Sequence, residues 1–135
     1  MKFDTKIKII LRDDLEPWEE LNVTAFLASG IASLEGVTGE PYEDADGNQY
    51  LPMSRQPVMI LTASSDKIKE VRQKAMDRDM NVAVYTREIF ETYNDEDNRA
   101  EVKKHKAEDL DLVGIGIRGP KNQLDRITKG IEMHK

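Results

Sequence analysis

Five polar residues are the candidates for a ligand-binding site in this sequence: Asp14, Asn22, Arg55, Thr86 and Arg99. Asp14 follows an apolar run, and α/β proteins bind ligands beyond the carboxyl ends of such strands. Either arginine is suited to hold a carboxylate or phosphate through two parallel hydrogen bonds. Each candidate also has a structural alternative: a helix cap for Asp14 or Thr86, a solvated position for Asn22, and a surface ion pair for the arginines.

The glycines at Gly114, Gly116 and Gly119 satisfy the pattern G-x-G-x-x-G. A dinucleotide site also needs a following strand and an acidic residue about 20 positions on. Neither follows within the 135 residues. We therefore expect Gly114 and Gly116 to mark a strand that another backbone or a ligand approaches closely.

The sequence gives little support for a metal site, for histidine catalysis or for thiol chemistry. The two histidines, His105 and His134, lie near predicted helix ends, where a cation complements the helix dipole, and neither has metal-ligand spacing. The alternation at Asp44, Asp46 and Asn48 is similar to a calcium loop, but the glycine comes two positions early. Cysteine is absent, which excludes disulfides and thiolate chemistry. We expect no metal and no cofactor, and no catalytic residue is assigned.

The charge pattern argues against nucleic acid as a partner. The formal net charge is −6, which opposes the approach of phosphates. A basic run at residues 103–106 follows an acidic run at 95–97, as expected for a helix that complements its own dipole. Residues 23–34 form the longest apolar stretch, which is shorter than the ~20 residues that span a bilayer. We expect a cytoplasmic protein with no membrane partner and no tRNA partner.

The pattern of elements predicts a single domain over residues 1–135. Apolar runs predict strands at 6–11, 57–63, 81–85 and 111–117, and helical periodicity predicts helices near 16–34, 64–78, 94–106 and 120–133. The Asp46-Gly47 pair between Tyr42 and Tyr50 predicts a hairpin turn. Alternating strands and helices predict a three-layer α/β/α fold with a four-stranded mixed core sheet.

The closing segment, Leu112-Val-Gly-Ile-Gly116 through Asp125-Arg-Ile-Thr-Lys-Gly-Ile131, resembles that of type 2 peptidyl-tRNA hydrolases, as does the opening Ile10-Leu-Arg-Asp-Asp-Leu15. The whole chain is similar to the uncharacterised bacterial domain-of-unknown-function 2000 family, considered to share that fold. This similarity rests on Arg12-Asp-Asp-Leu-x-x-Trp18, Leu51-Pro-Met-x-Arg-Gln-Pro57 and Asn94-Asp-x-x-Asn-Arg99. The resemblance implies a type 2 peptidyl-tRNA hydrolase-like domain.

The first helix departs from the hydrolase pattern, which carries Lys, Gln and His. Asn22, Phe26 and Ser29 occupy those positions. The hydrolases' Asp after the third strand falls near Thr86, where this chain has no Asp. An amide carries no positive charge and cannot stabilise an oxyanion as Lys would. Peptidyl-tRNA hydrolysis is therefore disfavoured.

Two function classes remain. The first is a protein that binds a small molecule or a peptide derivative, or a divergent hydrolase of another amide or ester. Its site would place Asn22 and Thr86 in one cavity, with Asp14 among its lining and Arg55 or Arg99 at its rim. The second is a non-catalytic interaction module that acts through a homodimer surface. A concave polar pocket favours the first class, and a flat apolar face favours the second.

Overall fold

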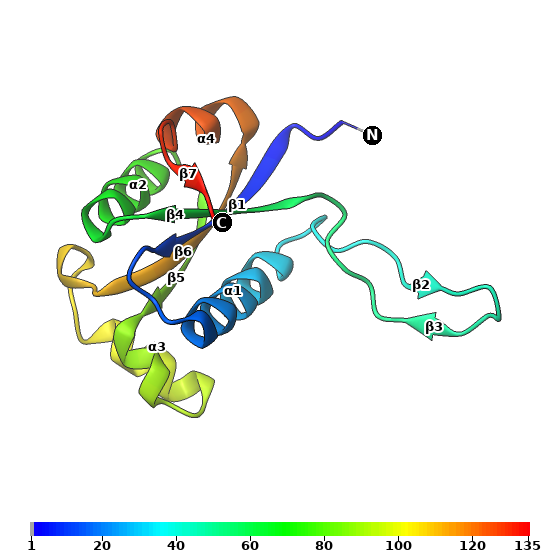
Figure 1. Cartoon of the computed structure of the whole chain (residues 1–135), viewed down its shortest axis with the longest axis horizontal. Coiled ribbons are helices and arrows are strands. Elements are labelled where there is room, and N and C mark those ends of the chain that lie inside the picture. Colours follow the sequence, from blue (N-terminus) through cyan, green and yellow to red (C-terminus); the bar gives the residue numbers. More distant parts are fainter. Residues whose placement is uncertain (1) are drawn as a thin grey trace.

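The structure is a computed structural model that describes residues 2–135 (Figure 1). Its main sheet consists of β1 (Thr5–Arg12), β4 (Val58–Ala63), β5 (Asn81–Thr86), β6 (Leu112–Pro120) and β7 (Glu132–Met133). The helices are α1 (Pro17–Ala32), α2 (Ser65–Asp77), α3 (Asp95–Lys103) and α4 (Lys121–Ile127), with 3-10 turns η1 (Arg87–Glu91) and η2 (Ala107–Asp109). A separate hairpin contains β2 (Tyr42–Glu43) and β3 (Gln49–Tyr50).

The main sheet is mixed, and its strand order is β5-β6-β1-β4-β7. Strand β1 runs parallel to β4 and antiparallel to β6, and β5 pairs only with β6. The four predicted strands are all present. The prediction of a four-stranded sheet is wrong, because β7 adds a fifth strand beside β4. The predicted helix 120–133 ends at Ile127, and Gly130, at φ 86°, turns the chain back toward the sheet.

Helices cover both faces of the sheet, which gives three layers (Figure 1). On one face Ile9 and Leu11 of β1 pack with Val23 and Leu27 of α1. On the other face Ile10 packs in the cluster that includes side chains of α2 and α4. Both faces of β1 are buried, and its second half, Ile9 to Leu11, is accordingly a continuous apolar run.

Two glycines in β6 allow α1 to lie close to the sheet. A Cβ atom added at Gly114 would lie 2.6 Å from Cγ1 of Val23, and one at Gly116 would lie 3.4 Å from side-chain atoms of Leu27 and Ile31. The close approach that the glycines predict is therefore made by a helix of the same chain. This packing fixes the position of α1 against β6, and therefore the position of the side chains on its exposed side.

Helix α1 begins with a capping box at Glu16 and Glu19, and Pro17 occupies the first turn. The alternative role of Asp14 as a helix cap is wrong, because the N-cap of α1 is Glu16. The side chain of Asp14 instead accepts a hydrogen bond from Nε of Arg12 at 2.7 Å. Because Pro17 occupies the first helical position, the N-cap residue is Glu16, and α1 begins three residues after Asp14.

Residues 40–53 form a hairpin arm that extends away from the layered body (Figure 1). The carboxylate of Asp44 organises its turn by accepting hydrogen bonds from the backbone N–H groups of Asp46 and Asn48, the Asn48 amide and the Tyr50 hydroxyl. These bonds, led by that of Tyr50, lower the pKa of Asp44 to about 2. Gly47, at φ 88°, confirms the predicted turn.

Within residues 2–135, none of the helices combines the length and the apolar character that crossing a bilayer requires.

Candidate functional site

A groove lies between α1 and α3, with β5 as its floor. We call it the α1–α3 groove. It consists of two cavities of about 460 and 380 Å³. The two cavities share five lining residues: Phe26, Tyr85, Ile89, Asp95 and Asn98. The larger, or edge chamber, continues along β5 past Ser29 and Arg99, and the smaller, or aromatic chamber, reaches Trp18 and Tyr93.

Aromatic rings form one wall of the aromatic chamber. The ring centroids of Trp18 and Phe90 lie 5.4 Å apart, those of Phe90 and Tyr85 5.0 Å, and those of Tyr85 and Phe26 5.9 Å. Trp18 and Phe26 remain 59% and 51% exposed. Exposed aromatic surface that lines a cavity is typical of ligand sites, because a bound molecule removes that surface from water.

Asn22 lies on the same flank of α1, between Trp18 and Phe26. Its Oδ1 accepts a hydrogen bond of 2.7 Å from the hydroxyl of Tyr85. Its amide nitrogen has no hydrogen-bond partner within residues 2–135, so the NH₂ group is available to a ligand in the aromatic chamber that Asn22 lines. Burial raises the pKa of Tyr85, and the Glu19 carboxylate adds to the rise, so this phenol stays a neutral donor.

An ion pair joins the start of α1 to the first residue of η1, directly after β5. Nη1 of Arg87 lies 3.0 Å from Oε2 of Glu19, and the Arg87 guanidinium lies 5.5 Å from the ring centroid of Phe90. The Glu19 carboxylate also accepts the hydrogen bond from the Glu16 N–H in the capping box. This pair positions η1, and therefore Phe90, against α1.

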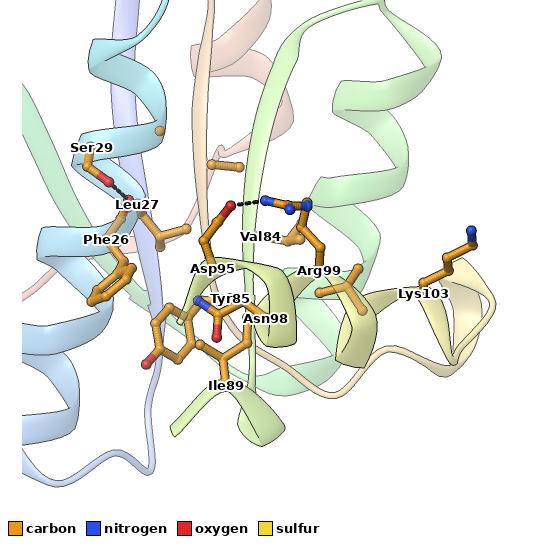
Figure 2. Close-up of a pocket in the computed structure, with 13 residues that line it drawn as sticks. Phe26, Leu27, Ser29, Val84, Tyr85, Ile89, Asp95, Asn98, Arg99 and Lys103 are labelled. Carbon is orange, nitrogen blue, oxygen red and sulfur yellow. Dashed lines mark hydrogen bonds and ion pairs between the residues drawn. The ribbon is translucent and has the colours of Figure 1, made fainter. Parts of the chain in front are cut away.

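The opposite wall is α3, which has no buried residue. It is attached near the groove by the hydrogen bond from Thr92 to Asn98 and by the packing of Val102 against the core. Arg99 pairs with Asp95 along the helix, and Lys103 follows one turn later at the rim (Figure 2). The edge chamber therefore has an apolar floor and a cationic rim.

The structure brings together two of the five predicted site residues. Asn22 and Arg99 line the two chambers of the groove from opposite walls. Thr86 is 1% exposed, its hydroxyl has no partner within residues 2–135, and it lines neither chamber. Successive side chains of a strand point to opposite faces of the sheet. Because the side chain of Tyr85 faces the groove, that of Thr86 points away from it.

The other two candidates lie outside the groove. The hydrogen bond from Arg12 holds the pKa of Asp14 below its usual value, so this carboxylate serves an ion pair near the end of β1. Arg55 lies at the base of the hairpin arm beside Gly39 and donates to the Gly36 carbonyl. It lines a different cavity, formed by residues 38–42 and 53–55. The functional role of all five residues stays a prediction.

The sequence interpretation missed most of the groove's aromatic residues. Neither Trp18 nor Phe26 is among the five predicted site residues, yet both rings are half-exposed at the groove. The available signal was spacing, because Trp18, Asn22 and Phe26 recur every four residues and so lie along one flank of a helix. Tyr85 completes the wall only because β5 ends beside that flank.

The groove offers hydrogen-bond donors, ring faces and positive charge. Ser29, the hydroxyl that lines the edge chamber from α1, donates to the carbonyl of Phe26 at 2.6 Å (Figure 2). Residues 2–135 contain no group of three or more His, Cys, Asp or Glu side chains placed to hold a metal ion. The side chains that line the groove can therefore recognise a ligand through ring stacking, amide hydrogen bonds and charge.

Over residues 5–135 the sequence matches the family described as protein of unknown function (DUF2000). The chain belongs to this family. This DUF2000 chain is also similar to a solved structure, the protein of unknown function Atu0240 from Agrobacterium tumefaciens strain C58. The two are 40% identical, with a TM-score of 0.93 over 99% of this chain and 100% of the other. Among curated proteins, none matches this chain.

Proposed function

We propose that this DUF2000 protein binds a small molecule or a peptide derivative in the α1–α3 groove. The observation that carries the proposal is the row formed by Trp18, Asn22 and Phe26, which presents two half-exposed rings and an unpartnered amide NH₂ to one cavity. A few polar groups among apolar side chains are the usual composition of a ligand pocket.

The groove's chemistry indicates the kind of ligand. An apolar or aromatic body would stack on Phe26 and Trp18, and a carbonyl oxygen would accept a hydrogen bond from the Asn22 amide. Arg99 and Lys103 at the rim favour an anionic group, since charge-assisted hydrogen bonds are about twice as strong as neutral ones.

The resemblance to type 2 peptidyl-tRNA hydrolases is part of this proposal. It supports the location, because Asn22, Phe26 and Ser29 stand where those enzymes carry Lys, Gln and His. It does not support their reaction, because none of these three side chains carries a positive charge or acts as a general base. A divergent amide or ester hydrolase would need a nucleophile, and the Ser29 hydroxyl is directed to a backbone carbonyl. We therefore favour binding without hydrolysis.

The alternative, a non-catalytic interaction module acting as a homodimer, is favoured by a different observation. Leu51, which directly follows β3 on the hairpin arm, is 85% exposed and lies near the half-exposed rings of Tyr42 and Tyr50. A partner surface that covers the arm would bury these side chains.

A thermal-shift screen with a library of aromatic carboxylates and amides tests the proposal. A ligand at about 100 times its dissociation constant adds ~2.7 kcal/mol to the free energy of unfolding. We expect Phe26→Ala or Asn22→Ala to remove the shift. Leu21→Ala is the matched control, because Leu21 is 73% exposed on α1 and lines neither chamber.

Arg99→Gln separates ligand classes, and should weaken carboxylates more than amides. Hits that survive both Phe26→Ala and Asn22→Ala would place the binding site elsewhere and contradict the proposal.

A further inference from the structure

Strand β5 opens its free edge into the edge chamber. It is the terminal strand of the sheet and pairs only with β6. Three consecutive residues of β5, Ala83, Val84 and Tyr85, line the edge chamber. Because successive side chains of a strand point to opposite faces, a cavity that touches all three must border the edge of the strand.

The backbone of this edge has unused hydrogen-bonding capacity. In an antiparallel pair, alternate residues direct their N–H and C=O groups away from the neighbouring strand. No segment of residues 2–135 pairs with β5 on that side. Proteins commonly protect such an edge with charged side chains or Pro. Residues 82–84 are Val, Ala and Val, and none of them gives that protection.

We propose that the α1–α3 groove binds an extended, acidic peptide segment, which adds to β5 as a sixth strand. The inference rests on the proposed function of the groove and specifies its ligand class. β5 has six residues, and at about 3.3 Å per residue it presents an edge of roughly 20 Å, enough for a peptide of about four to six residues. Main-chain bonds to β5 supply affinity, and alternate side chains fill the flanking spaces.

The walls of the groove select the side chains of the peptide. Residues that face α1 meet Phe26 and the ring of Tyr85, which favours apolar or aromatic side chains. Residues that face α3 meet Arg99 and Lys103. Arg99 already forms an ion pair with Asp95. Lys103 has no ion-pair partner within residues 2–135, so Lys103 can pair with an acidic side chain of the peptide.

A single strand fits this site better than a second copy of the protein. The free edge lies between α1 and α3, which flank the space that a second sheet would need (Figure 2). Two copies of a chain with net charge −6 also repel each other. An isolated peptide brings no second sheet, and its acidic side chains would lie next to Arg99 and Lys103 at the rim.

The test uses the full-length protein and a pool of capped hexapeptides in which Glu alternates with Val, Tyr or Phe. We expect the pool to contain binders that slow amide hydrogen exchange at alternate residues of β5. The best peptide is then N-methylated at each position in turn. Methylation at every second position should weaken binding about tenfold or more, because each methyl group removes one bond to β5, while the intervening positions should tolerate it.

Charge variants add an independent readout. Lys103→Glu should weaken the same peptide about tenfold, whereas Lys104→Glu should not, because Lys104 is exposed but lies outside the groove and pairs with Glu101. Uniform effects of N-methylation, or protection at strands other than β5, would overturn strand addition. So would a dimer in sedimentation velocity that dissociates on Val84→Lys, since the edge would then belong to a second copy.

Failure of this inference is distinguishable from failure of the proposed function. If aromatic carboxylates bind and lose affinity on Phe26→Ala while no peptide of the pool binds, the groove is a ligand site but strand addition is wrong. If neither class binds, both proposals are wrong.

Discussion

Gly114 and Gly116 both face α1, but the space around them is unequal. A Cβ at Gly114 would lie 2.6 Å from Cγ1 of Val23 and 3.3 Å from the Ile10 carbonyl oxygen, whereas the nearest atoms to a Cβ at Gly116 lie at 3.4 Å. We expect Gly114→Ala to lower the free energy of unfolding by about 1–3 kcal/mol, because β-branched Val23 and the backbone yield little. Gly116→Ala should be near neutral. Urea denaturation measures the free energy of unfolding of both variants. Equal losses of stability would contradict the closer packing of α1 at Gly114 than at Gly116.

Lys8 is a charged side chain held inside the protein. It is 6% exposed, and its Nζ lies 2.7 Å from Oγ1 of Thr128 and 2.9 Å from Oδ1 of Asp125. Asp125→Ala should destabilise the fold by roughly 1–3 kcal/mol, because it leaves a buried ammonium with one partner fewer. Adding Lys8→Met should restore part of that loss, since the buried charge is then gone. A double-mutant cycle by thermal or urea unfolding measures the coupling, and strict additivity would contradict it.

The same pair predicts a pH dependence. Hydrogen bonds from Lys6 and Lys8 lower the pKa of Asp125 in the folded protein. A carboxylate whose folded pKa is lowered stabilises the fold above its unfolded pKa of about 3.9, and this contribution disappears as the pH falls through the folded value. The stability difference between the natural protein and Asp125→Ala should therefore shrink below about pH 4. A difference that is constant down to pH 2 would contradict this assignment.

At the scale of elements, the hairpin arm should unravel without the rest of the protein. Asp44→Ala removes four hydrogen bonds that organise the turn, so we expect rapid proteolysis within residues 40–53 and no change in the melting temperature of the body. Asp46→Ala is the matched control, because its side chain accepts none of these bonds. The pKa of Asp44 is lowered to about 2, so the arm of the natural protein should keep its protease resistance at pH 4. Loss of the arm at pH 4 would contradict this role.

Patterns within single elements predicted most of the fold. Helix 64–78 was predicted from its helical periodicity, and the structure has α2 at Ser65–Asp77 with Ser64 as its N-cap. The segment after Ile127 was predicted wrongly, because helical spacing at Leu124, Ile127 and Ile131 continues past the turn that Gly130 makes. A strand as short as β7 has too few residues to show an alternating pattern, so only its pairing with β4 identifies it.

The candidate site was less predictable than the fold, because it depends on contacts between elements. Asn22 and Arg99 share a groove only because α3 packs beside β5 opposite α1, and no local pattern reports that arrangement. Thr86 and Arg55 follow or precede predicted strands as expected. The buried Thr86 side chain points away from the groove. Arg55 lies at the base of the hairpin arm and lines a different cavity.

At the scale of the whole molecule, we expect no appreciable binding to tRNA at physiological salt. The net charge of −6 opposes the approach of a polyanion, and two cations at one rim supply few of the phosphate contacts that nucleic-acid binding needs. A gel-shift assay measures binding, and hydrolysis of a peptidyl-tRNA substrate measures activity. Turnover that disappears on Asn22→Ala would reverse this view and restore the hydrolase interpretation.

The central place of β1 has a consequence for how the chain is made. Its two neighbours are β4 and β6, and Lys6 at one end of β1 contacts Asp125, 119 residues later in the sequence. At synthesis rates of about 5–20 residues per second, a ribosome needs roughly 6–24 s to cover that distance. During that time the edge of β1 that pairs with β6 has no partner, and an unpaired strand edge is a template for pairing with other chains. The central strand of this fold therefore keeps one edge unpaired until most of the chain has been made.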